Sequence, residues 1–307
     1  MITSIFSKSK PINFIVIFFI TLLAFVMGRL GVSTEDISVR FVIEELGLFF
    51  LGYASILMVN FIVNKNNLTQ KNNYNILLFS LFLFTLTQTT INSNILFSNF
   101  FVLLGLRRVI SLRSQIQVNK KLFDAAFWFA IAALFYFWAI LFFVLILLSL
   151  ILYHDFKVNH WLIPFIGVVT VFIITSAISI ICYDSFFDTF NSLPEVSFNF
   201  NSYNLASSII AITILLSFGV WASIFYVNSI KEKKKSFRVP FKSVLISAFI
   251  GFSIVVFAPI KDGSEFLFLF APLAIIIANY IEIIQEKWFK EIFLSVLILL
   301  PFVLLLL

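Results

Sequence analysis

The stretch that decides the fold is residues 122–153, LFDAAFWFAIAALFYFWAILFFVLILLSLILY, which holds one charged side chain, Asp124. As a single helix this stretch would measure about 48 Å, because each helical residue advances about 1.5 Å. The hydrocarbon core of a bilayer is about 30 Å thick. The stretch is therefore too long for one upright crossing and somewhat short for two, so the topology depends on how it folds.

The composition of the whole chain predicts a membrane protein. Of 307 residues, 61% are apolar and 12% are charged, and 43 are phenylalanine. The charged share is about half that of an ordinary soluble domain, and one soluble core of this size could not bury so much apolar surface. The single cysteine, Cys182, excludes a disulfide scaffold. We expect an all-α polytopic transmembrane helical bundle, one integral-membrane domain over residues 1–307 with no soluble domain.

Nine further apolar runs are long enough to be candidate spans. Lys8 and Lys10 precede the first of them, which is longer than the roughly 7–15 apolar residues of a signal peptide and is therefore expected to stay as an uncleaved span. The runs are 13–32, 41–63, 74–89, 94–111, 161–182, 205–227, 242–259, 265–284 and 291–307.

The basic residues choose between ten and eleven spans. If the N-terminus is cytoplasmic and residues 122–153 form a hairpin turning near Tyr136–Trp138, only three of the 21 basic residues lie outside: Arg29, Arg40 and Lys261. A single crossing would place the basic cluster 231–242 outside, against the rule that basic loops stay in the cytoplasm. We therefore predict about eleven spans in the inner membrane of a bacterium, with ten as the alternative.

The acidic residues gather on the opposite side, which is where we expect any active site. This topology places nine of the fifteen acids on the external side: Glu35, Asp36, Glu44, Glu45, Asp184, Asp188, Glu195, Asp262 and Glu265. Acidic residues contribute little to orientation, so their enrichment is a separate observation.

The first external loop and the helix after it hold the densest charge cluster. Arg40 lies four residues before Glu44, so the two side chains can meet on one helix face. Glu44 and Glu45 begin an apolar helix, where ionised carboxylates are costly unless they are paired or face water. The cluster is either a salt-bridged helix start at the headgroup level or a carboxylate cluster that acts as general base or metal ligand in an external cavity.

The other external segments allow two interpretations each. Asp184 and Asp188 share a helix face and could hold a cation, although solvated loop acids are the simpler explanation. Lys261 precedes the turn residue Gly263 and could pair with a nearby acid or contact an anionic ligand. The uncharged patch 85–94 could bind a polyol, or it satisfies a turn at the interface.

Several function classes are excluded by missing motifs. The chain has no nucleotide-binding glycine loop, no nucleophile elbow and no paired-histidine zinc helix. His154 and His160 are too few for a multi-histidine iron oxygenase, so no metal site is predicted and no cofactor is indicated. The net charge of +6 is explained by cytoplasmic loops. The expected partners are membrane lipids and no nucleic acid.

Two resemblances suggest a functional class. The opening MITSIFSKSKPINF, residues 1–14, resembles the start of a family of bacterial polytopic inner-membrane proteins that carries no established activity. At the level of pattern, Glu35-Asp36, residues 94–108 (NILFSNFFVLLGLRR), the hairpin 122–153 and residues 261–278 (KDGSEFLFLFAPLAIIIA) are similar to GT-C-type glycosyltransferases, which use polyprenyl-phosphate sugars. The arginine-tyrosine pair usual in the last segment of those enzymes is absent.

The GT-C resemblance implies sugar transfer in cell-envelope biogenesis, from a lipid-linked sugar to an acceptor on the external face. Glu35 or Asp36 would be the catalytic base, and Lys261 or Arg40 would neutralise the phosphate, with Glu44 and Glu45 nearby in the substrate site. The alternative is a non-catalytic scaffold or a transport component, in which the acids anchor helices at the headgroups or carry a cation through Glu44 and Glu45. The sequence leaves open whether the protein is an enzyme.

Overall fold

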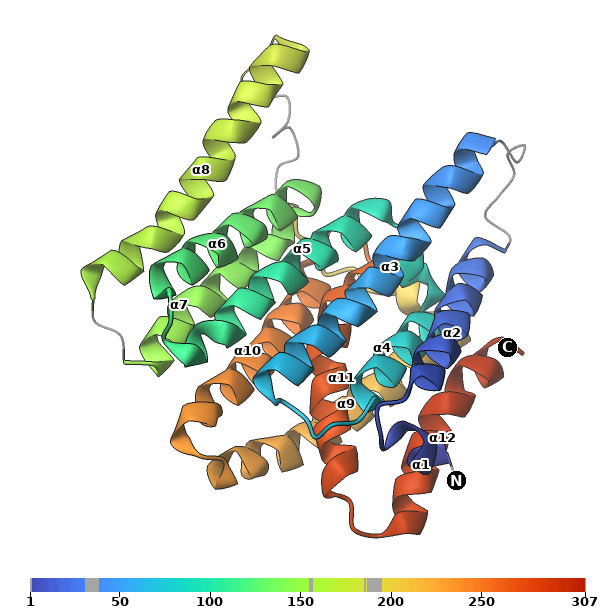
Figure 1. Cartoon of the computed structure of the whole chain (residues 1–307). Coiled ribbons are helices and arrows are strands. Elements are labelled where there is room, and N and C mark those ends of the chain that lie inside the picture. Colours follow the sequence, from blue (N-terminus) through green and yellow to red (C-terminus); the bar gives the residue numbers. More distant parts are fainter. Residues whose placement is uncertain (1, 31–38, 155–156, 185, 187–194, 307) are drawn as a thin grey trace.

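The computed structural model describes residues 2–30, 39–154, 157–184, 186 and 195–306, and Figure 1 shows their arrangement. The α-helices are α1 Ile2–Phe6, α2 Pro11–Arg29, α3 Val39–Asn66, α4 Tyr74–Thr85, α5 Ser93–Ile110, α6 Val118–Phe135, α7 Phe142–Leu152, α8 Val158–Tyr183, α9 Ala206–Glu232, α10 Lys235–Phe257, α11 Leu267–Ile283 and α12 Lys287–Leu304. Short 3-10 helices are η1 Thr87–Thr90, η2 Ser111–Ser114, η3 Phe137–Leu141, η5 Asn201–Tyr203 and η6 Ser264–Phe266.

The predicted all-α class is confirmed, since every regular element of the described residues is a helix. Each of the nine apolar runs outside residues 122–153 coincides with one helix. Seven of the described helices are long and apolar enough to cross a membrane, and shorter apolar helices cover 74–85 and 137–152. The chain is therefore built as a membrane protein, whereas eleven spans with a cytoplasmic N-terminus stay a prediction.

Residues 122–153 fold as two helices that meet at Tyr136. The Tyr136 amide closes α6 by donating to the carbonyl of Ala132 at 3.0 Å, and its backbone is extended at φ −146° and ψ 107°. Trp138, two residues later, donates its indole N–H to the carbonyl of Glu195 at 3.2 Å. The break lies where the hairpin was predicted to turn.

Two helices, α4 and α11, form the centre of the bundle. All twelve residues of α4 are buried, as are 15 of the 17 residues of α11. The ring of Phe270 packs against those of Phe79 at 6.2 Å and Phe82 at 5.6 Å between centroids. A helix that is apolar all round is one that is buried on every side, so these two helices are shielded by their neighbours.

The outer helices surround this pair and keep large apolar side chains on their outer faces. Figure 1 shows α8 at the edge of the molecule, projecting past the end of α6. Its inner face approaches α6 at Gly167, where an added Cβ would lie 2.9 Å from the Cβ of Ala126. Its outer face exposes Phe165, Ile173 and Ile181, as expected of a helix that borders lipid.

Candidate functional site

The predicted external cluster separates into two ion pairs in the structure. Glu35 and Asp36 lie outside the described residues. Arg40 pairs with Glu44 over 2.8 Å from Nε to Oε1, and both side chains are mostly exposed, at 87% and 58%. This pair is the i, i+4 contact that the spacing predicts, and it lies on the surface of α3 rather than in a cavity.

The second pair joins α2 to α3 and is more sheltered. Arg29, at the end of α2, pairs with Glu45 of α3, and neither side chain is more than about a quarter exposed. The Arg29 guanidinium also donates to the carbonyl of Thr90 at 3.0 Å and to its hydroxyl at 3.3 Å. The polar patch 85–94 therefore helps to hold Arg29, and through it the first two long helices.

Lys261 lies in the loop after α10 and is 3% exposed. Its ammonium donates to the carbonyls of Val255 at 2.9 Å, Val256 at 2.8 Å and Ala258 at 3.2 Å, which end α10. A cation at the carboxyl end of a helix compensates the unpaired carbonyls there. Burial lowers the pKa of this lysine from its ordinary value, and its three donors are already used.

Glu265 is the fully buried acid of the same loop. Its carboxylate accepts hydrogen bonds from the hydroxyl of Tyr203 and, at 3.1 Å, from the amide of Gly263. The hydroxyl of Tyr136 is buried without a hydrogen-bond partner in the described structure. Burial, with smaller contributions from Glu265 and Asp262, raises the pKa of Tyr136. The structure thus gathers a buried carboxyl and two phenols at the end of α11 that begins with Leu267, which the charge pattern predicts to be external.

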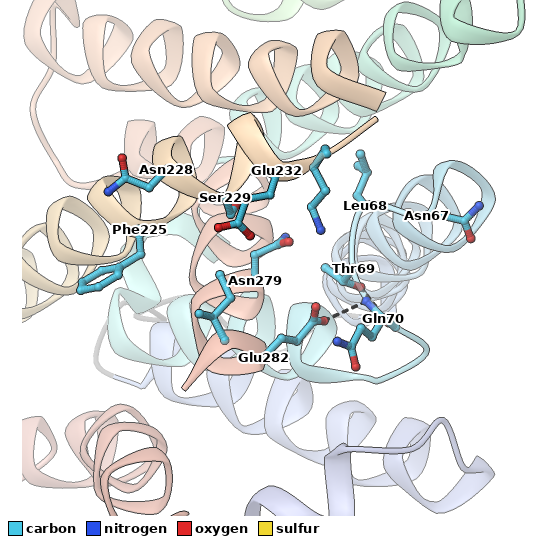
Figure 2. A pocket seen from close by; sticks show the side chains of 12 residues that line it. Asn67, Leu68, Thr69, Gln70, Phe225, Asn228, Ser229, Glu232, Asn279 and Glu282 are labelled. Atoms are coloured by element: carbon cyan, nitrogen blue, oxygen red, sulfur yellow. Dashed lines mark hydrogen bonds between the residues drawn. The ribbon is translucent and has the colours of Figure 1, made fainter. Parts of the chain in front are cut away.

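A large pocket lies at the opposite end of the bundle, which the basic loops predict to be cytoplasmic. Its volume is about 550 Å³, and its walls come from the loop after α3, the last turns of α9 and the end of α11. Figure 2 shows the carboxylates of Glu232 and Glu282 with the amide of Asn279 in the same space. We refer to this cavity as the polar pocket.

Glu282 is held firmly in this pocket by the loop that follows α3. Its carboxylate accepts a hydrogen bond from the Gln70 amide at 2.9 Å, drawn in Figure 2, and another from the side chain of Asn72. Asn279 is 3% exposed and donates to the carbonyl of Ile275 at 2.8 Å, which orients its side chain. Fixed amide and carboxylate groups of this kind can bind hydroxyl groups with defined geometry.

One cation completes the lining of the polar pocket. Lys233 follows the last residue of α9 and lines the cavity together with Glu232. Its ammonium also lies 5.1 Å from the ring centre of Phe241. The pocket therefore offers a positive charge for a phosphate beside acids and amides for hydroxyls. Among the described residues, no group of three or more histidine, cysteine or acidic side chains is placed to hold a metal ion.

The sequence does not predict this pocket, because the residues of the pocket form no local pattern. Residues 67–70, Glu232 and Glu282 lie in three distant parts of the chain, and each part taken alone has only polar residues at a helix end. A signal was present, however, in the five asparagines between the last residue of α3 and the first turn of α4: Asn66, Asn67, Asn72, Asn73 and Asn75. Asn72, Asn73 and Asn75 are buried, which is unusual for asparagine.

Comparison with known proteins gives a family and no activity. No curated protein matches the chain, and no solved structure matches it. A family model described as a family of unknown function, DUF6427, matches residues 1–306.

Proposed function

The chain belongs to DUF6427, and from that premise we propose that it is a bacterial inner-membrane protein that binds the phosphate-and-sugar headgroup of a lipid in the polar pocket. The observation that carries this proposal is the lining of the 550 Å³ cavity, where Glu282 and Asn279 are fixed beside Lys233. Hydroxyl groups are bound by such carboxylates and amides, and a phosphate is bound by the ammonium.

The position of the pocket supports a lipid-linked ligand. It lies at the ends of α9 and α11, both of which are apolar enough to cross a membrane. A ligand in this cavity can keep its hydrocarbon part in the bilayer and its polar part in the pocket. A polyprenyl-phosphate sugar has this shape, and it is the ligand class that the GT-C resemblance implies.

Sugar transfer by Glu35 or Asp36 is a separate proposal, because it would take place at the other end of the molecule. The 17 residues of α11 measure about 25 Å, so groups at its two ends cannot share one transfer step. The GT-C-type enzyme would place its donor beside Arg40 and Lys261 on the external face. The pairs Arg29–Glu45 and Arg40–Glu44 favour the non-catalytic alternative, in which these acids stabilise helices.

Binding tests the proposal directly. The purified full chain is incubated with a polyprenyl-phosphate hexose, and bound lipid is measured by native mass spectrometry. We expect Glu282→Gln and Lys233→Gln each to weaken binding about tenfold or more, because a hydrogen bond to a charged group contributes about 1.5–3 kcal/mol. Glu286→Gln is the matched control, since this exposed acid lies four residues beyond Glu282 and outside the pocket. Equal binding by all three variants would contradict the proposal.

A genetic experiment tests sugar transfer. The gene is deleted and then complemented with Glu35→Ala or Asp36→Ala, and lipid-linked sugars and surface glycans are profiled. If the protein is a GT-C-type enzyme, we expect the lipid-linked sugar donor to accumulate in the deletion strain. At least one of the two variants should then fail to clear the accumulated donor. An unchanged glycan profile in the deletion strain removes the transferase and leaves the scaffold or transport component.

A further inference from the structure

A second cavity lies on the other face of α9 and has a different chemistry. It is a groove of about 490 Å³ between α9 and α10, and α11 forms its floor. Its lining is apolar apart from Ser223, and it includes Leu216, Val220, Leu245, Phe249 and Leu269. Val220 and Phe249 are 64% and 71% exposed, so the groove opens away from the bundle. We refer to it as the apolar groove.

Basic residues continue the groove face of each helix toward the cytoplasmic end. On α10 the series Lys235, Arg238 and Lys242 runs at helical spacing into Leu245 and Phe249. On α9, Lys231 lies eleven residues from Val220, which is three turns along the same face. Lys231, Lys235 and Lys242 are exposed. The apolar groove therefore ends in a cluster of accessible positive charge.

Tyr226 and Phe241 join α9 to α10 at the end of the apolar groove that lies near the basic residues, so a bound polar group stays at the surface. The rings of Tyr226 and Phe241 stack with centroids 5.6 Å apart, and the Tyr226 hydroxyl donates to the carbonyl of Phe241 at 3.2 Å. This contact joins α9 to α10 beyond the apolar lining, at the level of Lys242, which follows Phe241 in the chain. A chain can therefore enter from the side, while its headgroup stays outside among the lysines.

The length of this surface matches one leaflet of a bilayer. Lys242 and Phe252 are ten residues apart on α10, or about 15 Å along the helix axis. That distance is about half of the 30 Å hydrocarbon core. One acyl chain of a phospholipid has this reach, whereas a polyprenyl chain would extend past the end of the groove.

We propose that the apolar groove and its basic end form a binding site for an anionic phospholipid of the cytoplasmic leaflet. One acyl chain lies between α9 and α10 against α11, and the phosphate contacts Lys231 and Lys242. Anionic headgroups are attracted to such basic clusters near the membrane surface. The bound lipid fills the space between two helices that otherwise meet through Tyr226 and Phe241, and through the Arg238 guanidinium, which donates to the carbonyls of Lys231 and Lys233.

The site is independent of the polar pocket. The polar pocket uses the face of α9 that holds Phe225, Asn228 and Glu232, while the groove uses Leu216, Val220 and Ser223. At 100° per residue these two sets lie on opposite sides of the helix. Variants in one site therefore leave the other lining intact, and failure of one proposal does not imply failure of the other.

The experiment compares lipid retention by the full chain in detergent. Wild type, the double variant Lys231→Gln/Lys242→Gln and the matched control Lys10→Gln/Lys120→Gln are each titrated with phosphatidylglycerol or phosphatidylcholine and measured by native mass spectrometry. We expect wild type and control to retain phosphatidylglycerol at least fivefold better than phosphatidylcholine. We expect the double variant to lose this preference while its unfolding temperature stays unchanged.

A second variant tests the chain rather than the headgroup. Ala248→Phe places a ring in the groove without changing any charge, and it should reduce phosphatidylglycerol retention at least threefold. Retention equal to wild type in both the double variant and Ala248→Phe would overturn the proposal. Equal retention of the two lipids by wild type would overturn it as well, because the basic end would then give no selectivity.

Discussion

Arg29 at the end of α2 and Arg40 at the start of α3 each pair with a glutamate of α3, and their surroundings differ. Arg29 is mostly buried and binds Glu45 and Thr90 together, so its removal leaves a sheltered carboxylate and a carbonyl without their donor. The Arg40–Glu44 pair is exposed, and exposed pairs contribute little because water screens the charges. The spacing predicts the Arg40 pair, whereas only the packing of α2 on α3 reveals the Arg29 pair.

At the residue scale we predict that Arg29→Ala destabilises the protein and that Arg40→Ala does not. Arg29→Ala should lower the free energy of unfolding by about 1–3 kcal/mol, because buried polar groups lose their partners. Thermal unfolding in detergent, followed by circular dichroism, measures the difference. Equal unfolding temperatures for the two variants would show that Arg29 does not hold α2 to α3.

The partners of Lys261 could not be predicted from its neighbours in the sequence. Lys261 was expected to pair with an acid or to contact an anionic ligand, and in the structure it binds three carbonyls at the end of α10. Its sequence neighbours Asp262 and Glu265 bind Ser264 and Tyr203 instead. Local spacing placed these side chains in one loop, but the partner of each was decided by segments far away in sequence.

At the element scale, close helix packing depends on small residues. Gly251 of α10 lies against α11, where an added Cβ would be 2.8 Å from the carbonyl oxygen of Phe268 and 3.0 Å from the Cα of Leu269. Both neighbours are backbone atoms of a buried helix and cannot rotate away. Such small residues allow helices in a membrane to approach closely.

We therefore predict that Gly251→Ala is destabilising, by about 1–3 kcal/mol through overpacking. Gly47→Ala is the matched control, because an added Cβ at Gly47 meets nothing within 4 Å. Alanine also favours the helix, so this control should be neutral or stabilising. Unfolding temperatures of the two variants measure the contrast, and a neutral Gly251→Ala would mean that α10 can move away from α11 at little cost.

The distribution of basic residues predicts a turn between α6 and α7, whereas helix propensity does not. Residues 122–153 contain no glycine or proline, the usual helix breakers. In the structure the ring of Tyr136 stacks on Phe268 at 5.5 Å, and that of Trp138 stacks on Phe257 at 5.7 Å. These contacts with α10 and α11 stabilise the turn. The positive-inside rule predicted that a turn was needed, and tertiary packing supplied the reason for its position.

At the scale of the whole molecule, the orientation in the membrane is the prediction to test. We expect a reporter fused after Asn191 to be external and one fused within Lys233–Lys235 to be cytoplasmic, since 18 of the 21 basic residues then lie inside. A cytoplasmic signal after Asn191 would contradict the eleven-span arrangement. It would also reverse the sides assigned to the polar pocket and to the acidic loops.

The sequence by itself determined that most of the chain is suited to a bilayer and where its helices lie. The reason is that insertion of a segment in a bilayer depends on the apolar composition and length of that segment alone. It also indicated which loops carry charge. Only the tertiary structure decided that α4 and α11 are central, that Glu282 and Asn279 share a pocket with Glu232, and that α9 and α10 border a groove. The physical reason is that polar partners and cavities arise where helices distant in sequence pack together, and hydropathy is nearly the same on every face of these helices.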